Sequence, residues 1–399
     1  MKYFDYVIVG GGLAGVSAIK GIRERDGEGS ILLVTKEVNL PYNRPPLSKE
    51  LLLGKEDVAD IFVEDDNFYD QKEVAVEMET LITEVNPDEK SIVGEDGKSY
   101  GYGKLLLATG GYPRKLDIPG GDLEGIIYYR DLEDYKRLHN LIETSKSAIV
   151  VGGGFIGSEI AAALNLNDLN VKMVFPESYL LEKIFPKELA RSVQRDYEDR
   201  GVKILSGKLP EEITKSDGGY TLRTEDGVTS RGDMVIAGIG INPAVDLCKE
   251  GDFDVFEGIE VDEHLQTSCP DVFAAGDNAY FPYAALEDCV RVEHWDNALN
   301  QGKLAGRNMA GADEPYDYIP YFYSDLYDFG FEALGDVQAH LDTFIDWKEE
   351  GKKGVAYYLS DDGKVRGVLL LGVWGKKGHA RKLIERKECF REEDLVDAI

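Results

Sequence analysis

The sequence predicts an α/β protein with two Rossmann-like units and a C-terminal segment of α+β type. Three observations predict this class. A strand, a glycine-rich turn, a helix and a second strand follow one another over residues 5–37. The same succession recurs from residue 147. The last part of the chain alternates apolar and polar residues between turns such as Asp-Asp-Gly, which is typical of antiparallel strands. The length of 399 residues suits two or three domains.

The first unit begins with the apolar strand DYVIVG, and GGLAGVSAIKGIRER then has helical spacing of its apolar residues. SILLVTKE predicts the second strand. Gly10, Gly12 and Gly15 form G-x-G-x-x-G at the turn, and Glu37 follows Gly15 by 22 residues. The first glycine allows a tight turn, the second lets a pyrophosphate approach, and the third lets the helix pack on the strand. The pattern favours a dinucleotide site over a plain tight turn.

The second unit, SAIVVGGGFIGSEIAAALNLNDLNVKMVFPE, lies 142 residues further along the chain. Its glycines are Gly152, Gly154 and Gly157, and Glu177 follows Gly157 by 20 residues. Two such units indicate either two bound dinucleotides or a duplicated fold. A carboxylate at the end of the second strand accepts hydrogen bonds from a ribose 2′-hydroxyl and repels a 2′-phosphate. Glu177 therefore predicts NADH in preference to NADPH.

Three further segments concern the first site. NLPYNRPPLSKELLLGK, residues 39–55, has three prolines, so we expect a stiff loop that ends in a short helix. GKLLLATGGYP, residues 103–113, and PDVFAAGDNAYF, residues 270–281, each read as a strand that ends in a glycine-containing turn. Asp277 in the latter can accept hydrogen bonds from sugar or ribitol hydroxyls. This late return of the chain suits a cofactor longer than NAD, with a ribityl chain and a flavin.

Composition excludes several classes of function. The net charge of −30 argues against nucleic acid as a partner. No apolar run approaches the ~20 residues of a membrane span, and the first residues enter a strand directly, so we expect neither a membrane segment nor a signal peptide. The four cysteines form no C-x-x-C pair, which argues against a zinc site and a local redox dithiol and predicts a cytoplasmic protein. The acidity fits either a salty host or simple solubility.

Taken together, these motifs resemble the two-dinucleotide-domain flavoproteins, and among them the oxygenase-type ferredoxin reductases, the rubredoxin and putidaredoxin reductases and apoptosis-inducing factor. The resemblance rests on VIVGGGLAG, LPYNRPPLSKELL, LLLATGGYPR, VVGGGFIGSEIA, VFPE, AGIGINPAVDL, VFAAGD and EHWDNALNQGKLAGRNMAG. YSDLYDFGFEALG matches more loosely. It implies an FAD-binding domain at 1–112 and 246–313, an NAD-binding domain at 113–245 and a C-terminal α+β domain of the dimerisation or interface type at 314–399.

The resemblance also implies roles for single residues. Arg44 and Pro45 would lie against FAD, and Lys49 would face the N5–C4 edge of the flavin and pair with Glu159. Trp295 would form an apolar wall beside the ring, with His294 before it. Two positions depart from the usual pattern, since Lys36 stands where relatives carry a carboxylate for the ribose, and Tyr323 stands where they carry a tryptophan that faces the nicotinamide.

We expect Lys49 and Glu159 to act in catalysis, in the sense of positioning and charge stabilisation, because hydride transfer needs no general acid or base. The remaining candidate cofactor-binding residues lie in the same motifs: Leu13, Ala14, Ala108, Thr109, Gly110, Arg114, Phe155, Ile156, Gly240, Gly276 and Ala298. We expect no metal.

The predicted function is an FAD-dependent NADH oxidoreductase that passes electrons to a small carrier protein of the ferredoxin or rubredoxin type. One alternative is a redox-sensing interaction protein similar to apoptosis-inducing factor, and another is an NADH oxidase or quinone reductase of the same fold. A peroxidase relative would need a reactive cysteine near RPPLSK, and no cysteine precedes Cys248. Partners would be NADH and the carrier, without nucleic acid or membrane, and a homodimer is compatible with the sequence.

A basic segment stands out in this acidic chain. KKGHARKLIERK, residues 376–387, contains six cationic side chains and one carboxylate. Its spacing predicts a helix on which several charges share a face. It is either a docking patch for an acidic carrier or a solvated helix that pairs with the chain's own carboxylates.

Overall fold

The computed structural model describes residues 1–249 and 251–399 and separates the chain into two compact units. Unit 1 comprises residues 1–43, 58–112 and 242–320, and unit 2 comprises residues 44–57, 113–241 and 321–399. The predicted α/β class is confirmed. The division into three domains stays a prediction, and its segment 246–313 includes residue 250, which lies outside the described residues.

Unit 1 is built on a seven-stranded sheet with the order β3-β2-β1-β6-β5-β4, to which β18 adds by pairing with β6. The strands β1, β2, β3, β6 and β18 run parallel, whereas β4 and β5 pair antiparallel. Val7 and Ile8 of β1 are fully buried, as expected for a parallel strand covered on both faces. The strands are β1 (Lys2–Val9), β2 (Ile31–Val34), β3 (Val74–Glu77), β4 (Ile82–Asn86), β5 (Ser91–Gly94), β6 (Ser99–Leu107) and β18 (Val272–Ala274).

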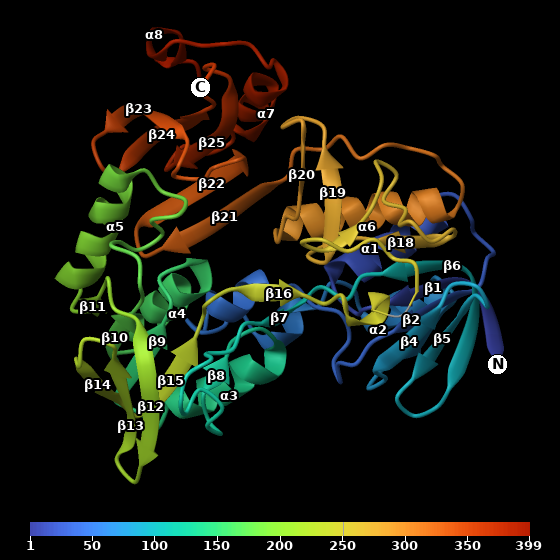
Figure 1. Ribbon diagram of the computed structural model, residues 1–399, viewed down its shortest axis with the longest axis horizontal. Helices are drawn as coiled ribbons and strands as arrows, with labels where there is room; N and C mark the ends of the chain where they lie inside the picture. The colour runs from blue at the N-terminus through green and yellow to red at the C-terminus, as the bar shows by residue number, and fades with distance from the viewer. Residues whose placement is uncertain (250) are drawn as a thin grey trace. The chain divides into compact units, whose positions relative to one another are not determined.

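Two helices of unit 1, α1 (Leu13–Arg23) and α6 (Trp295–Met309), lie side by side (Figure 1). Glycines permit this close approach, because a Cβ at Gly302 would lie 2.2 Å from the carbonyl oxygen of Ala14, and one at Gly306 would lie 2.1 Å from that of Ala18. Helix α6 begins directly after its N-cap residue, His294. The other elements are α2 (Asp66–Gln71), β17 (Ile259–Glu260), β19 (Ala279–Tyr283), β20 (Asp288–Val290) and the 3₁₀ turns Val58–Ile61 and Asp246–Cys248.

Unit 2 contains a parallel five-stranded sheet in the order β11-β10-β9-β15-β8 and a three-stranded antiparallel sheet, β12-β13-β14. This is the second Rossmann-like unit. Its elements are β8 (Ile127–Tyr128), α3 (Leu132–Ile142), β9 (Ser147–Val151), α4 (Phe155–Leu166), β10 (Asn170–Val174), α5 (Lys187–Asp199), β11 (Lys203–Leu205), β12 (Pro210–Ser216), β13 (Gly219–Thr224), β14 (Thr229–Gly232) and β15 (Met234–Ala237). Short strands β7 (Gly111–Pro113) and β16 (Ile241–Pro243) occur where the chain passes from one unit to the other.

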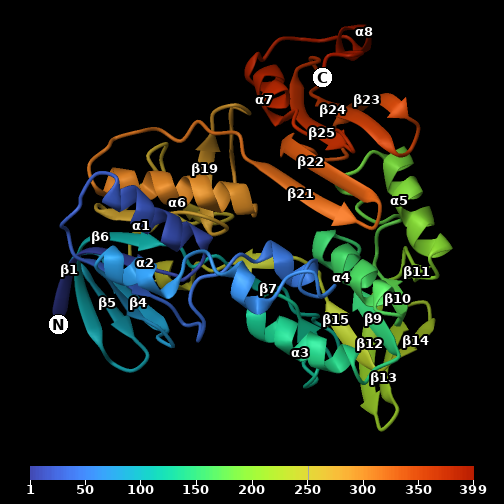
Figure 2. The same ribbon diagram turned by 180° about the vertical axis from the view of Figure 1, so that it is seen from behind.

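The C-terminal part of unit 2 forms an antiparallel sheet in the order β21-β22-β25-β24-β23. The predicted strands in TFIDWKEEG, KGVAYYLSDDG and KVRGVLLLGVWG are confirmed as β23, β24 and β25. Figure 2 shows α7 beside this sheet. The elements are β21 (Tyr321–Leu326), β22 (Phe329–Gly335), β23 (Asp342–Glu349), β24 (Lys353–Leu359), β25 (Val365–Leu371), α7 (Lys377–Glu385) and α8 (Glu392–Leu395).

Candidate functional site

The glycine turn of unit 1 shows which of its glycines packing requires. Gly10 has φ +123°, and a Cβ there would lie 2.1 Å from the carbonyl oxygen of Ala108. A Cβ on Gly15 would lie 2.3 Å from the carbonyl oxygen of Gly10. Gly12 is different, because a Cβ there meets nothing within 4 Å. Folding therefore explains two of the three glycines, and the third keeps the space before the first turn of α1 open, where a phosphate is favoured.

The turn of unit 2 repeats this arrangement. Gly152 has φ +115°, with a built Cβ 2.3 Å from the carbonyl oxygen of Gly238, and a Cβ on Gly157 would lie 2.2 Å from that of Gly152. Gly154 again faces open space. The side chain of Ile156, in the first turn of α4, is 39% exposed. Two separate units of the protein thus each present an uncovered helix N-terminus behind a glycine turn.

Around the first turn, unit 1 gathers the predicted residues of LLLATGG and AAGD. Thr109 donates its hydroxyl proton to the carbonyl of Ala244 at 2.8 Å and accepts a hydrogen bond from the Asn278 amide at 3.0 Å. Gly276 has φ +89° and donates its amide proton to the Gln301 side chain at 2.9 Å. Asp277 is half-buried, and its backbone carbonyl accepts from Arg291 at 3.0 Å.

The end of β2 places Glu37 and Lys36 differently. Glu37 is half-buried and accepts a hydrogen bond from the hydroxyl of Tyr42 at 2.7 Å, which fixes the orientation of its carboxylate. Lys36 is exposed, and its ammonium lies 4.8 Å from the centre of the Tyr112 ring. Of the two predicted residues, Glu37 offers the acceptor that a ribose hydroxyl needs.

The start of α6 carries His294 and Trp295. His294 is the N-cap residue, and Trp295 donates its indole proton to the side-chain oxygen of Asn43 at 2.8 Å. Burial lowers the pKa of His294 to about 4, although the negative charge of Asp277 acts in the opposite direction. The imidazole is consequently neutral near pH 7. Ala298, one turn into the helix, donates its backbone N–H to the carbonyl of His294 at 3.0 Å.

The segment RPPLSK differs from the prediction in the type and the position of its helical turn. We expect a short helix in LSKELLL, but the structure has a 3₁₀ helix over Pro45–Ser48 and turns after it. The two prolines explain this, because a proline at the start of a helix loses no hydrogen bond and has its φ already fixed. Arg44 donates from its guanidinium to the backbone carbonyl of Arg130 at 2.8 Å, and Tyr129 donates its hydroxyl proton to that of Leu47. These contacts hold the segment against the connection between β8 and α3.

Lys49 and Glu159 form the predicted ion pair, and the two residues are only 9% and 5% exposed. The ammonium lies 2.9 Å from Oε1 of Glu159. The same carboxylate accepts hydrogen bonds from the hydroxyls of Ser48 and Ser324, each at 2.5 Å. The extra donors offset the cost of burying the carboxylate, which a lone ion pair often fails to do.

Tyr323 stands beside this pair. The Lys49 ammonium lies 5.1 Å from the centre of its ring, within the range of a cation–π contact. Tyr323 is 37% exposed, so one part of its ring is available to a flat ligand. Partial burial raises the pKa of its phenol to about 12. Phe155, at the start of α4, packs edge-on against Phe322 with 5.3 Å between ring centres.

The remaining predicted residues of unit 2 lie at strand ends. Glu177, after β10, pairs with the exposed Lys183 at 2.8 Å, so the carboxylate is already partly compensated. Arg114 is exposed, donates its backbone N–H to the carbonyl of Gly240 at 2.9 Å, and donates from its guanidinium to that of Ile241 at 3.1 Å. Gly240 has φ +96°, a conformation that favours glycine.

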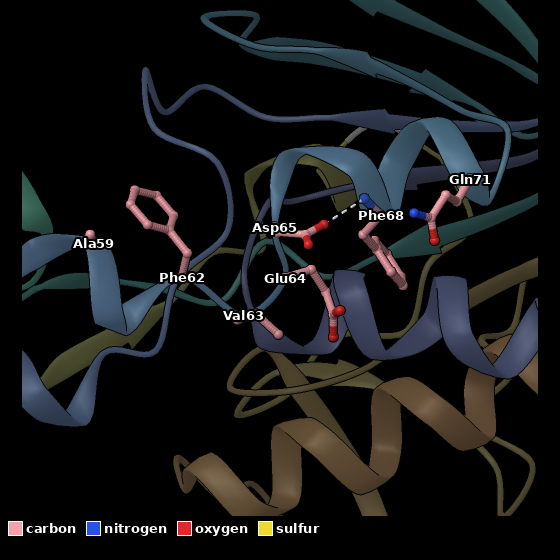
Figure 3. A pocket seen from close by; sticks show the side chains of 7 residues that line it. All are labelled: Ala59, Phe62, Val63, Glu64, Asp65, Phe68 and Gln71. Atoms are coloured by element: carbon pink, nitrogen blue, oxygen red, sulfur yellow. Dashed lines mark hydrogen bonds between the residues drawn. The ribbon is translucent and has the colours of Figure 1, made fainter.

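One surface concavity of unit 1 is lined by residues from the segment 59–71. It surrounds the start of α2 in unit 1, where the Asp65 carboxylate caps the helix by accepting from the Phe68 amide at 3.0 Å (Figure 3). Glu64 at its rim pairs with Lys20. The concavity contains none of the predicted site residues. Its lining residues are Ala59, Phe62, Val63, Glu64, Asp65, Phe68 and Gln71.

Over residues 1–249 and 251–399, no group of three His, Cys, Asp or Glu side chains is arranged to hold a metal ion. A helix of sufficient length and apolar character to cross a membrane is likewise missing from these residues. All four cysteines are free thiols, with Cys248 and Cys269 buried and Cys289 and Cys389 exposed.

Sequence reasoning missed the two serines that complete the charged cluster and the residue that receives Arg44. Ser48 lies inside the RPPLSK motif and Ser324 directly follows Tyr323, so both are adjacent to predicted site residues. Their contacts with Glu159 span 111 and 165 residues of sequence. Arg130 offers only its backbone to Arg44, a contact that has no signal in the sequence.

The fold and the residues fit two dinucleotides. The spaces kept open by Gly12 and Gly154 lie where a pyrophosphate is expected in such turns, and Glu37 and Glu177 carry carboxylates of the kind that accepts hydrogen bonds from ribose hydroxyls. In unit 1, the neutral His294 and the Trp295 indole are groups that suit a flat, polar-edged ring, and in unit 2 the buried Lys49 is another such group. These features define a flavoprotein of the two-dinucleotide-fold class.

The family model for pyridine nucleotide-disulphide oxidoreductases matches residues 4–302, so the chain belongs to that family. It is 35% identical to the mitochondrial apoptosis-inducing factor 1 of Dictyostelium discoideum, over 98% of this chain and 80% of that protein. It is 34% identical to monodehydroascorbate reductase 3 of Arabidopsis thaliana, over 99% and 97% of the two chains. It is 32% identical to the ferredoxin–NAD(+) reductase component of the anthranilate 1,2-dioxygenase system of Burkholderia cepacia, over 100% and 98%.

Solved structures agree with this assignment. The ferredoxin reductase from Rhodopseudomonas palustris superposes with a TM-score of 0.92 at 27% identity, covering 98% of this chain and 97% of that one. The covalent putidaredoxin reductase–putidaredoxin complex gives 0.92 at 29% identity, covering 99% and 96%. The resemblance seen in the motifs is confirmed, and the protein is an FAD-dependent NADH oxidoreductase.

Proposed function

We propose that this protein passes electrons from NADH, through FAD, to a small carrier protein of the ferredoxin or rubredoxin type. The observation that carries the proposal is the pair of equivalent glycine turns, one in each unit, each with a central glycine that packing does not require. The full-length match to a ferredoxin–NAD(+) reductase component supports the class of acceptor. Bound FAD would accept two electrons as hydride and release them singly.

The residues of the chain have distinct roles in this proposal. The turn at Gly12 and the carboxylate of Glu37 bind FAD, and the turn at Gly154 and Glu177 bind NADH. Tyr323 stacks on the nicotinamide. Lys49 faces the N5–C4 edge of the flavin and stabilises the negative charge of the reduced form. Glu159 offsets the free-energy cost of burying the Lys49 ammonium. Trp295 and the neutral His294 exclude water from the ring.

A second candidate acceptor is a small organic radical, which the 34% identity to a monodehydroascorbate reductase supports. The alternative redox-sensing role is supported by the 35% identity to apoptosis-inducing factor. An NADH oxidase or quinone reductase activity stays the third alternative. Cytoplasmic location and a homodimer stay predictions.

Steady-state turnover with NADH separates these functions. The proposal expects fast reduction of a ferredoxin or rubredoxin and slow reduction of monodehydroascorbate, quinone and oxygen. Fast monodehydroascorbate reduction with slow carrier reduction would favour the second candidate. Slow turnover with every acceptor, together with NADH-triggered dimerisation, would favour the redox-sensing role.

A further inference from the structure

We propose that Ser324 is a positioning residue for Lys49. By sharing Oε1 of Glu159 with the lysine ammonium, Ser324 limits how far the carboxylate neutralises that cation. The serine thereby raises the tendency of the bound flavin to be reduced. This inference rests on the proposed function, in which Lys49 faces the flavin.

The geometry of Glu159 separates its two oxygens. Oε1 lies 2.9 Å from the Lys49 ammonium and 2.5 Å from the Ser324 hydroxyl. Oε2 lies 2.5 Å from the Ser48 hydroxyl. Ser324 therefore acts on the same oxygen as the lysine, and Ser48 acts on the other. Both serines are buried, at 1% and 3% exposure, so solvent does not compete for these two hydrogen bonds.

The strand that carries Ser324 contacts both members of the ion pair. Ser324 bonds the carboxylate, and its neighbour Tyr323 places its ring 5.1 Å from the ammonium. Strand β21 is fixed by its pairing with β22, in which Tyr323 faces Glu332 and Ser324 faces Phe331. The C-terminal sheet, which contains neither glycine turn, thus contacts both the Glu159 carboxylate on α4 and the Lys49 ammonium in the 44–57 segment.

The sign of the effect follows from electrostatics. A hydroxyl that donates to Oε1 draws negative charge away from the lysine, and in a buried site such a charge-assisted hydrogen bond is strong. Without this hydrogen bond, Lys49 is the remaining partner of Oε1, and the attraction between the ammonium and the carboxylate becomes stronger. The carboxylate then cancels more of the positive potential that Lys49 creates at the flavin. A reduced, anionic flavin is then less stabilised.

The test measures the reduction potential of bound flavin in Ser324→Ala against a reference dye, with a chemical reductant and without NADH or carrier. We expect the ratio of reduced to oxidised flavin at a fixed poise to fall about tenfold, which is about 30 mV lower for a two-electron couple. Ser324→Thr keeps the hydroxyl and should restore the parent value. Ser48→Ala, the matched control on Oε2, should change the ratio less than about threefold on the same scale.

A double variant isolates the route. In a Glu159→Gln background, Ser324→Ala should cause no further shift, because the shared charge is gone. A shift that persists in that background, an unchanged potential in a flavin-loaded Ser324→Ala, or equal effects of the two serines would each overturn the proposal. If the parent protein binds no flavin, the proposed function itself is overturned before any variant is compared, and this outcome is distinct from a failure of the Ser324 proposal.

Discussion

We expect the carboxylate of Glu177 to set the preference between NADH and NADPH. Its charge would repel the 2′-phosphate of NADPH, and such a clash costs several kcal/mol, so we expect kcat/KM to favour NADH by about a hundredfold. The ion pair with Lys183 at 2.8 Å reduces this preference, because the ammonium partly neutralises the carboxylate. Glu177→Ala should reduce the preference at least tenfold, since tenfold is only about 1.4 kcal/mol. Steady-state kinetics with both cofactors measure it, and equal efficiencies in the parent would refute the assignment.

Lys49 and Glu159 should behave as one unit. Lys49→Ala leaves a buried carboxylate without its cation, and such a loss costs about 3 to 5 kcal/mol of folding free energy. We expect both single alanine variants to slow flavin reduction by NADH, and the double variant to lose less than their sum. Rapid-mixing kinetics and denaturant unfolding supply the two readouts. Strict additivity would show that the pair does not act as a pair.

At the scale of elements, the two glycine turns should separate the two cofactors. An alanine at Gly12 or Gly154 meets no neighbouring atom, and both residues have negative φ, so folding should change by no more than about 0.5 kcal/mol. Gly12→Ala should weaken FAD binding, whereas Gly154→Ala should keep the flavin and raise the dissociation constant for NADH. Flavin release and NADH titration measure these effects. Loss of FAD in Gly154→Ala would contradict the assignment of the turns.

The N-cap of α6 should make the fold sensitive to acid. The pKa of His294 is lowered to about 4 in the folded chain, against 6.5 for an ordinary histidine. As pH falls from 6.5 to 4, the unfolded chain binds a proton that the folded chain refuses, so stability falls by about 3 kcal/mol. The partly buried Asp134 acts in the opposite direction, with a pKa raised to about 6. His294→Asn should therefore lose less stability than the parent over this range in denaturant titrations, and parallel curves would reject the shift.

These elements show what sequence can supply. Gly10, Gly15 and the strands that flank them were predictable because tight turns and buried parallel strands leave periodic signals. The cluster around Glu159 was predictable only in part. The pairing of Glu159 with Lys49 was predicted only through the resemblance to a known family. The contact between Glu159 and Ser324 spans 165 residues of sequence and depends on how the C-terminal sheet packs, for which the sequence has no periodic signal. The 3₁₀ start at Pro45 escapes prediction because stiff prolines favour an extended loop equally well.

At the scale of the whole molecule, the net charge of −30 opposes an acidic carrier, so any attraction must be local. Within residues 376–387, Lys377 is already engaged, with Glu332 at 2.9 Å and the Tyr321 ring at 3.6 Å. Arg386 and Lys387 are exposed. Charge reversal of both should lower the rate of carrier reduction in a salt-sensitive manner and leave flavin reduction by NADH unchanged. Lys203→Glu, at another exposed position, is the control, and unchanged carrier kinetics would show that the basic segment is not the docking site.

Transfer of electrons from NADH through FAD to a carrier protein can be followed in a sequential-mixing experiment in the absence of oxygen. The FAD-loaded protein is mixed first with NADH and then with an oxidised ferredoxin or rubredoxin, while visible absorbance is followed. We expect NADH to bleach the flavin absorbance and the carrier to restore it as the carrier itself becomes reduced. A flavin that NADH does not bleach, or a bleached flavin that no carrier reoxidises, would contradict it.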